Sequence, residues 1–147
     1  MRRFPITVLM ATVFLPAAMP AAAGEVFDWR SICASQQRKI PLVASDSKDF
    51  IGIWVGNWDR QMQAAVVVSA KTKDTEGRDI LWGLYVVAGN EAWKVLPDCS
   101  PFISSIESGS LKINFNSGRN VVMELAPNGL AKYHRGQSVA MGSFSKE

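Results

Sequence analysis

The sequence has very little of the chemistry that most enzymes and metal sites use. It holds one histidine, His134, and two cysteines, Cys33 and Cys99, among 147 residues. Neither cysteine has another cysteine or a histidine at metal-ligand spacing, which argues against a zinc site. There is no Gly-x-Ser-x-Gly motif, no phosphate-binding glycine loop and no Cys–His pairing. We therefore assign no catalytic residue, metal or cofactor, and we expect a protein that is not an enzyme, with His134 structural or at the surface.

The sequence also lacks concentrated charge of one sign. Its 16 basic and 13 acidic residues are intermixed, and beyond the N-terminus only Arg38 and Lys39 form an adjacent basic pair. Nucleic-acid binding needs a basic stripe that neutralises several phosphates, so we exclude that class of partner. Three carboxylates flank the first predicted strand, and we interpret them as solvated turn residues rather than glycosidase-like paired acids: Asp46, Asp49 and Asp59.

The one long uncharged run lies at the N-terminus. Arg2 and Arg3 precede residues 4–19, which carry no charge, and small residues follow up to Ala23. This order is typical of a secretory signal peptide over residues 1–23, cleaved after Ala23. The alternative, a membrane anchor, needs about 20 apolar residues, and two prolines interrupt this shorter run. We expect a periplasmic or secreted protein with no stable membrane insertion after cleavage, in which 14 basic residues face 13 acidic ones.

After an arm over residues 24–49, the chain from 50 to 147 consists of short β-like runs between turn residues. Residues 110–116 show the clearest period of two, and Pro127-Asn128-Gly129 is a tight-turn signature. The predicted strands are 50–58, 64–70, 80–88, 92–96, 102–106, 110–116, 120–126, 130–135 and 139–145. Such spacing favours one mainly β domain, a small antiparallel up-and-down barrel of about eight strands, with a β-sandwich as the alternative. Closure into a barrel would also remove exposed strand edges.

The two cysteines predict one disulfide, because an even pair in a small exported domain is more often bonded than free. The alternative is a pair of buried thiols. Cys33 lies in the arm, within a predicted short helix over residues 31–39, and Cys99 lies between two prolines in a segment expected to be irregular. The bond would pin the arm across the barrel. We expect the arm to plug one barrel end with its apolar residues, namely Val26, Phe27, Trp29 and Ile32.

The run from Phe50 to Gly56 resembles the opening strand of the calycins, the group of lipocalins, avidin-like proteins and fatty-acid-binding proteins. Its Gly52 and Trp54 match the Gly-x-Trp of that strand. The resemblance implies that Trp54 closes one end of the barrel and packs against a basic residue near the last strand. Arg135, in the terminal hairpin, is the candidate for that partner, through a cation–π contact.

Four other aromatic residues lie in or near predicted strands and suit a ligand site at a barrel mouth: Trp58, Trp82, Tyr85 and Trp93. The alternative is that they only fill the core. Trp82 shares a run with Ile80, Leu84 and Val86, which is typical of a core position, whereas Trp58 lies beside polar residues at a strand end. We expect a barrel that binds an apolar or amphipathic small molecule. The alternative is a protein-interaction domain with a packed interior, such as an inhibitor or an envelope-associated factor.

Overall fold

The computed structural model describes residues 26–43, 49–115 and 121–147, which form one short helix and eight strands. The predicted signal peptide lies outside this description. The helix is α1 (Trp29–Ser35). The strands are β1 (Gly52–Trp58), β2 (Met62–Lys73), β3 (Asp79–Val87), β4 (Asp98–Glu107), β5 (Ser110–Asn114), β6 (Val121–Leu125), β7 (Leu130–Arg135) and β8 (Ser138–Lys146).

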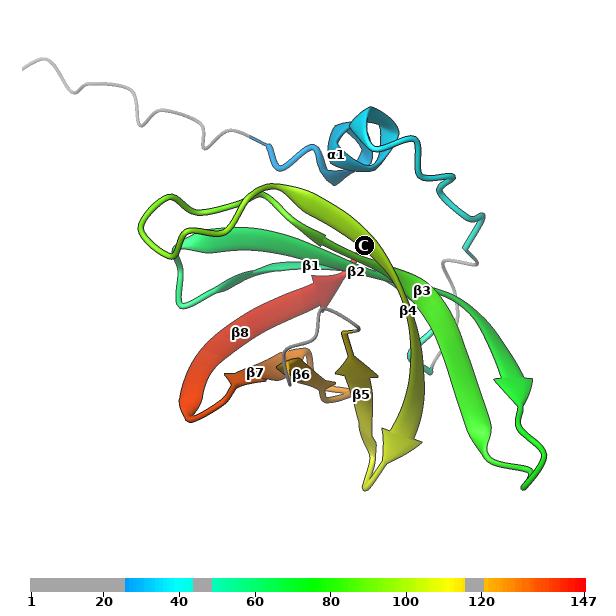
Figure 1. Ribbon diagram of the computed structural model, residues 1–147. Coiled ribbons are helices and arrows are strands. Elements are labelled where there is room, and N and C mark those ends of the chain that lie inside the picture. Colours follow the sequence, from blue (N-terminus) through cyan, green and yellow to red (C-terminus); the bar gives the residue numbers. More distant parts are fainter. Residues whose placement is uncertain (1–25, 44–48, 116–120) are drawn as a thin grey trace, which may run out of the picture.

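The eight strands close into an antiparallel barrel in which each strand pairs with its neighbours in sequence and β8 pairs back with β1 (Figure 1). The predicted up-and-down barrel is confirmed. Because the strands alternate in direction, β1, β3, β5 and β7 finish at one end of the barrel, which we call the Trp58 end. The connections after β2, β4 and β6 lie at the other end, together with the start of β1, and we call it the Trp54 end.

The barrel interior is filled by every second residue of the strands, as their pleat requires. In β1 the inward positions are Trp54, Gly56 and Trp58, and both indoles are buried. Gly56 is required by close strand packing, since a Cβ there would lie 1.9 Å from the carbonyl oxygen of Ser143 in β8. The aromatic and aliphatic side chains of the other strands complete this inner core.

The helix α1 lies outside the barrel (Figure 1), and a second apolar cluster packs between it and the barrel wall. Asp28 begins the helix by accepting a hydrogen bond from the Ser31 backbone N–H at 3.2 Å. Trp29 and Cys33, one helical turn apart, both face the wall and are buried. They pack on the outward residues Ala65 and Val67 of β2 and Leu84 and Val86 of β3.

A disulfide between Cys33 and Cys99 joins α1 to β4, as predicted. The described part of the arm does not plug an end of the barrel, however. Outward residues of β2 and β3 are aliphatic, so the wall itself needs a cover, and Trp29 supplies it there. The helix spans Trp29–Ser35 rather than the predicted 31–39.

Two strand predictions need correction. The sequence predicts a ninth strand over residues 92–96, but these residues form turns closed by an isolated bridge between Asn90 and Val95. Conversely, the segment around Cys99, predicted to be irregular, belongs to β4. Pro101 is tolerated there because, among the described pairings, β4 meets β5 only from Ser104 onward, so that Pro101 pairs with β3 alone.

Within the described ranges, no helix is long and apolar enough to cross a membrane.

Candidate functional site

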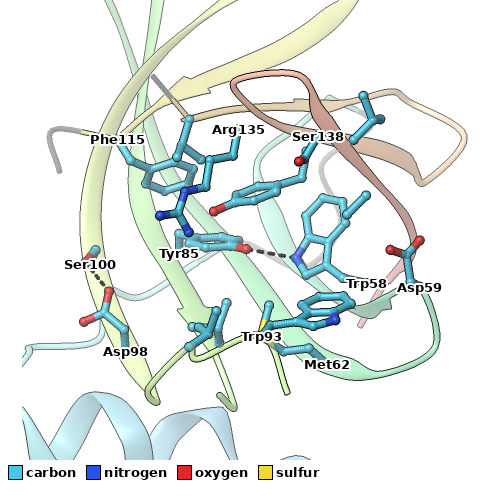
Figure 2. A pocket seen from close by; sticks show the side chains of 16 residues that line it. Trp58, Asp59, Met62, Tyr85, Trp93, Asp98, Ser100, Phe115, Arg135 and Ser138 are labelled. Atoms are coloured by element: carbon cyan, nitrogen blue, oxygen red, sulfur yellow. Dashed lines mark hydrogen bonds between the residues drawn. The ribbon is translucent and has the colours of Figure 1, made fainter. Parts of the chain in front are cut away.

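A pocket with a volume of about 530 Å³ opens at the Trp58 end of the barrel (Figure 2). Aromatic side chains make up much of its lining, and they come from four strands or their connections: Trp58, Tyr85, Trp93, Phe115 and Tyr133. Met62, Val87 and Val95 add aliphatic surface. The site is thus a concave, mostly apolar space of the size that small-molecule sites occupy.

The floor of the pocket is built by aromatic rings in tilted and edge-to-face contact. Trp58 packs on Tyr133 and on Phe144, with ring centroids 5.4 Å and 5.2 Å apart. Tyr85 packs on Phe115 at 4.6 Å. These contacts fix the rings without filling the mouth above them, so the barrel is packed at its middle and hollow at this end.

One hydrogen bond joins two buried polar groups of this floor. The indole Nε1–H of Trp58 donates to the Tyr85 hydroxyl at 2.9 Å (Figure 2). Burial raises the pKa of Tyr85 far above its ordinary value, so the hydroxyl stays protonated. Because a phenol both accepts and donates, Tyr85 keeps a proton to offer after accepting from Trp58.

Trp93 is held at the mouth by a compact loop between β3 and β4. Asn90 exchanges two backbone hydrogen bonds with Val95, at 2.8 and 3.0 Å, and its side-chain amide donates to the Gln61 carbonyl at 3.3 Å. The Asn90 side-chain oxygen also accepts from the Trp93 N–H at 3.0 Å. The loop is therefore tied to the β1–β2 turn, which places Trp93 next to the floor in a defined position.

Polar side chains stand around the aromatic surface. Asp98 accepts a hydrogen bond from the Ser100 hydroxyl, and Asp59 accepts from the Met141 N–H at 2.9 Å. Arg135 ends β7 and Ser138 begins β8, so both lie at the hairpin that joins these two strands. An apolar floor with a polar rim can hold an amphipathic molecule with its apolar part inward.

The structure brings together three of the four aromatic residues predicted for a ligand site. Trp58, Tyr85 and Trp93 line the pocket, but Trp82 does not. Trp82 does share a face with Ile80, Leu84 and Val86, but this face is the outside of β3, and α1 covers only Leu84 and Val86. Trp82 is 43% exposed, whereas Trp58, predicted at the rim, is 1% exposed.

The predicted contact between Trp54 and Arg135 is not formed, because the two residues lie at opposite ends of the barrel. Trp54 follows the start of β1, while Arg135 closes β7 and lines the pocket at the Trp58 end. The cation over the Trp54 ring is instead Lys146 of β8, with Nζ 5.3 Å from the ring centroid. Gly52 lies beside it with a φ of 147°, and a Cβ there would lie 2.2 Å from Lys146 Cε.

A second cavity of about 580 Å³ lies at the Trp54 end. Its apolar lining includes Phe50, Trp54 and Phe144. Two of its polar groups are already used within the protein: the Trp54 Nε1–H donates to the Phe50 carbonyl at 3.0 Å, and Lys146 Nζ donates to the Asp49 carbonyl at 2.7 Å. This cavity offers less polar chemistry for recognition than the one at the Trp58 end.

Sequence reasoning missed two aromatic members of the site, Phe115 and Tyr133. The signal for both was present in the period of two. Phe115 follows the alternation of Leu111 and Ile113, which face inward. Tyr133 follows the buried Ala131, and the same alternation continues to Arg135.

The fold and the site define a small closed β-barrel with an aromatic pocket open at one end. Searches against protein-family models, curated proteins and solved structures found no match. Over the described residues, no group of three His, Cys, Asp or Glu side chains is placed to hold a metal ion.

Proposed function

We propose that this protein is a binding barrel that holds an apolar or amphipathic small molecule in the pocket at the Trp58 end. The observation that carries the proposal is the aromatic cavity of about 530 Å³. Ligand pockets of small-molecule carriers measure several hundred cubic ångströms and are lined mainly by apolar and aromatic side chains. The alternative, a protein-interaction domain with a packed interior, does not account for a hollow of this size.

The proposal includes a calycin-like architecture and export from the cytoplasm. A closed eight-stranded antiparallel barrel with a ligand space at its mouth supports the first. The buried Cys33–Cys99 disulfide supports the second, because such bonds persist in oxidising compartments. A carrier in the periplasm or outside the cell would meet apolar molecules that need a shielded site in water.

The test uses N-phenyl-1-naphthylamine, an uncharged aromatic probe whose fluorescence rises in apolar surroundings. We expect saturable one-to-one binding, weakened about tenfold by Trp93→Ala, which corresponds to about 1.4 kcal/mol of lost contact. Trp82→Ala is the matched control, because it removes an indole from the outer wall. It should leave the dissociation constant within about twofold.

Two results would contradict the proposal. One is a complete lack of probe binding by the folded protein. The other is equal weakening by Trp93→Ala and Trp82→Ala, which would place the probe on the outer surface. Circular dichroism of each variant checks that the barrel is intact.

A further inference from the structure

Among the described residues that line the pocket at the Trp58 end, Arg135 is the one cation, and its position directs it inward. In β7 the residues Ala131, Tyr133 and Arg135 share the inner face, and Ala131 is buried in the core. Figure 2 shows the guanidinium of Arg135 pointing into the pocket, toward Tyr85. A cation that extends from a hairpin into an aromatic cavity is well placed to meet a ligand.

Within residues 26–43, 49–115 and 121–147, Arg135 has no hydrogen-bond or ion-pair partner. A guanidinium presents five N–H donors in a planar fork that matches the two oxygens of an oxyanion. Charge-assisted hydrogen bonds of this kind are roughly twice as strong as neutral ones.

The two acids of the lining have partners. Asp98 accepts from the Ser100 hydroxyl, and Asp59 accepts from the Met141 N–H. Figure 2 places Asp59 beyond Trp58, on the far side of the pocket from Arg135. Hydrogen bonds do not remove their negative charges, so these acids weaken the attraction for an anion without occupying the guanidinium.

We propose that the pocket selects amphipathic organic anions: molecules with an apolar, ring-bearing body and one carboxylate, sulfonate or phosphate group. This inference rests on the proposed function. The body would lie on the half-buried rings of Trp93 and Tyr133, and the anionic group would meet Arg135 at the mouth. The orientation follows from solvation, because a charge is costly to bury in the apolar floor and is both paired and hydrated at the mouth.

The test compares two probes that share one skeleton. The first is N-phenyl-1-naphthylamine, and the second is 8-anilinonaphthalene-1-sulfonate, which adds a sulfonate. We expect the sulfonate probe to bind about tenfold more tightly at low salt. The preference should shrink between 10 mM and 1 M salt, because ions screen exposed charges over a distance that falls from about 30 Å to about 3 Å.

The decisive variant is Arg135→Gln, with Lys132→Gln as its control. Lys132 lies on the same strand but on the outer face, so both changes remove one positive charge. Arg135→Gln should weaken binding of the sulfonate probe about tenfold and change the affinity for the neutral probe by less than about twofold. Lys132→Gln should change neither affinity by more than about twofold. Asp98→Asn should strengthen binding of the sulfonate probe, because it removes a repulsive charge.

The outcomes separate this inference from the function on which it rests. If the neutral probe binds at Trp93 but the sulfonate probe binds no more tightly, the proposed selectivity for anions is refuted and the proposed binding function is retained. The selectivity is refuted as well if Arg135→Gln and Lys132→Gln weaken sulfonate binding equally, since the effect would then be one of net charge. If the folded protein binds neither probe, the proposed function itself fails.

Discussion

The bond between Cys33 and Cys99 gives the most quantitative prediction about stability. Replacing both residues in Cys33→Ala/Cys99→Ala removes the covalent link between α1 and β4 without leaving a free thiol. The two residues are 66 positions apart, and the loop between them contains β1, β2 and β3. The bond therefore restricts a large part of the unfolded chain.

The expected loss follows from the loop length. For a closed loop of this size, the chain-entropy relation gives about 4 kcal/mol at 25 °C. That is a large share of the roughly 5–15 kcal/mol by which domains are stable. A second loss concerns α1 itself, which has seven residues and is too short to persist alone. Its release would expose the outer residues Ala65, Val67, Leu84 and Val86 to water.

Urea unfolding, followed by tryptophan fluorescence, measures the loss. With an m value of about 2 kcal/mol per molar, the midpoint of the double variant should fall by about 2 M. Reductant should lower the wild-type midpoint toward that of the variant and leave the variant unchanged. A midpoint that falls by less than about 0.5 M would show that the bond constrains the unfolded chain far less than its loop length requires.

Three further changes probe the core, the strand packing and the surface charges. Tyr85→Phe leaves the buried Trp58 Nε1–H without its acceptor and should cost about 1–3 kcal/mol in the free energy of unfolding by urea; an unchanged value would show that this hydrogen bond contributes nothing. Gly56→Ala should lower the melting temperature more than Gly77→Ala, because a Cβ meets a backbone oxygen 1.9 Å away at the first position, whereas at the second it meets open space and only the positive φ of 78° opposes it; equal losses would contradict the close approach of β1 and β8. The hydrogen bonds from Lys73 and then Lys71 lower the pKa of Asp79 below its ordinary 3.8, so the stability they add is full above about pH 4 and disappears as the pH falls through the lower folded-state pKa. Asp79→Asn should therefore destabilise the protein at pH 7 but not at pH 2 in thermal melts, and a loss that is the same at both pH values would exclude this linkage.

Much of the fold follows from local patterns in the sequence. Alternating apolar residues and turn residues at short intervals predict the sequential strands, and the need to bury one face favours closure. The first part of β4, around Cys99 and Pro101, could not be predicted in this way. Local propensity there favours irregular chain, and the strand exists because its pairing with β3 overrides that preference.

The candidate site is harder to predict, because a period of two tells which residues share a face but not which face is the inside. Trp82 and Leu84 share a face, and that face looks like a core because α1 covers part of it. The position of Arg135 depends on strand direction. Because β1 and β7 run in the same direction, Arg135 at the end of β7 lies at the barrel end opposite Trp54. That Arg135 belongs to the terminal hairpin does not by itself say at which end of the barrel it lies.

The central claim, a ligand site at the Trp58 end, is tested most directly by the five tryptophan indole N–H signals in a two-dimensional ¹H–¹⁵N spectrum. The five signals report on four places: Trp58 and Trp93 on the pocket, Trp54 on the other barrel end, Trp82 on the outer wall, and Trp29 on the contact between α1 and that wall. On titration with N-phenyl-1-naphthylamine, the signals of Trp58 and Trp93 should shift with one saturation curve while the other three stay in place. Shifts confined to Trp82 or Trp54, with Trp58 and Trp93 unmoved, would contradict the assignment of the site.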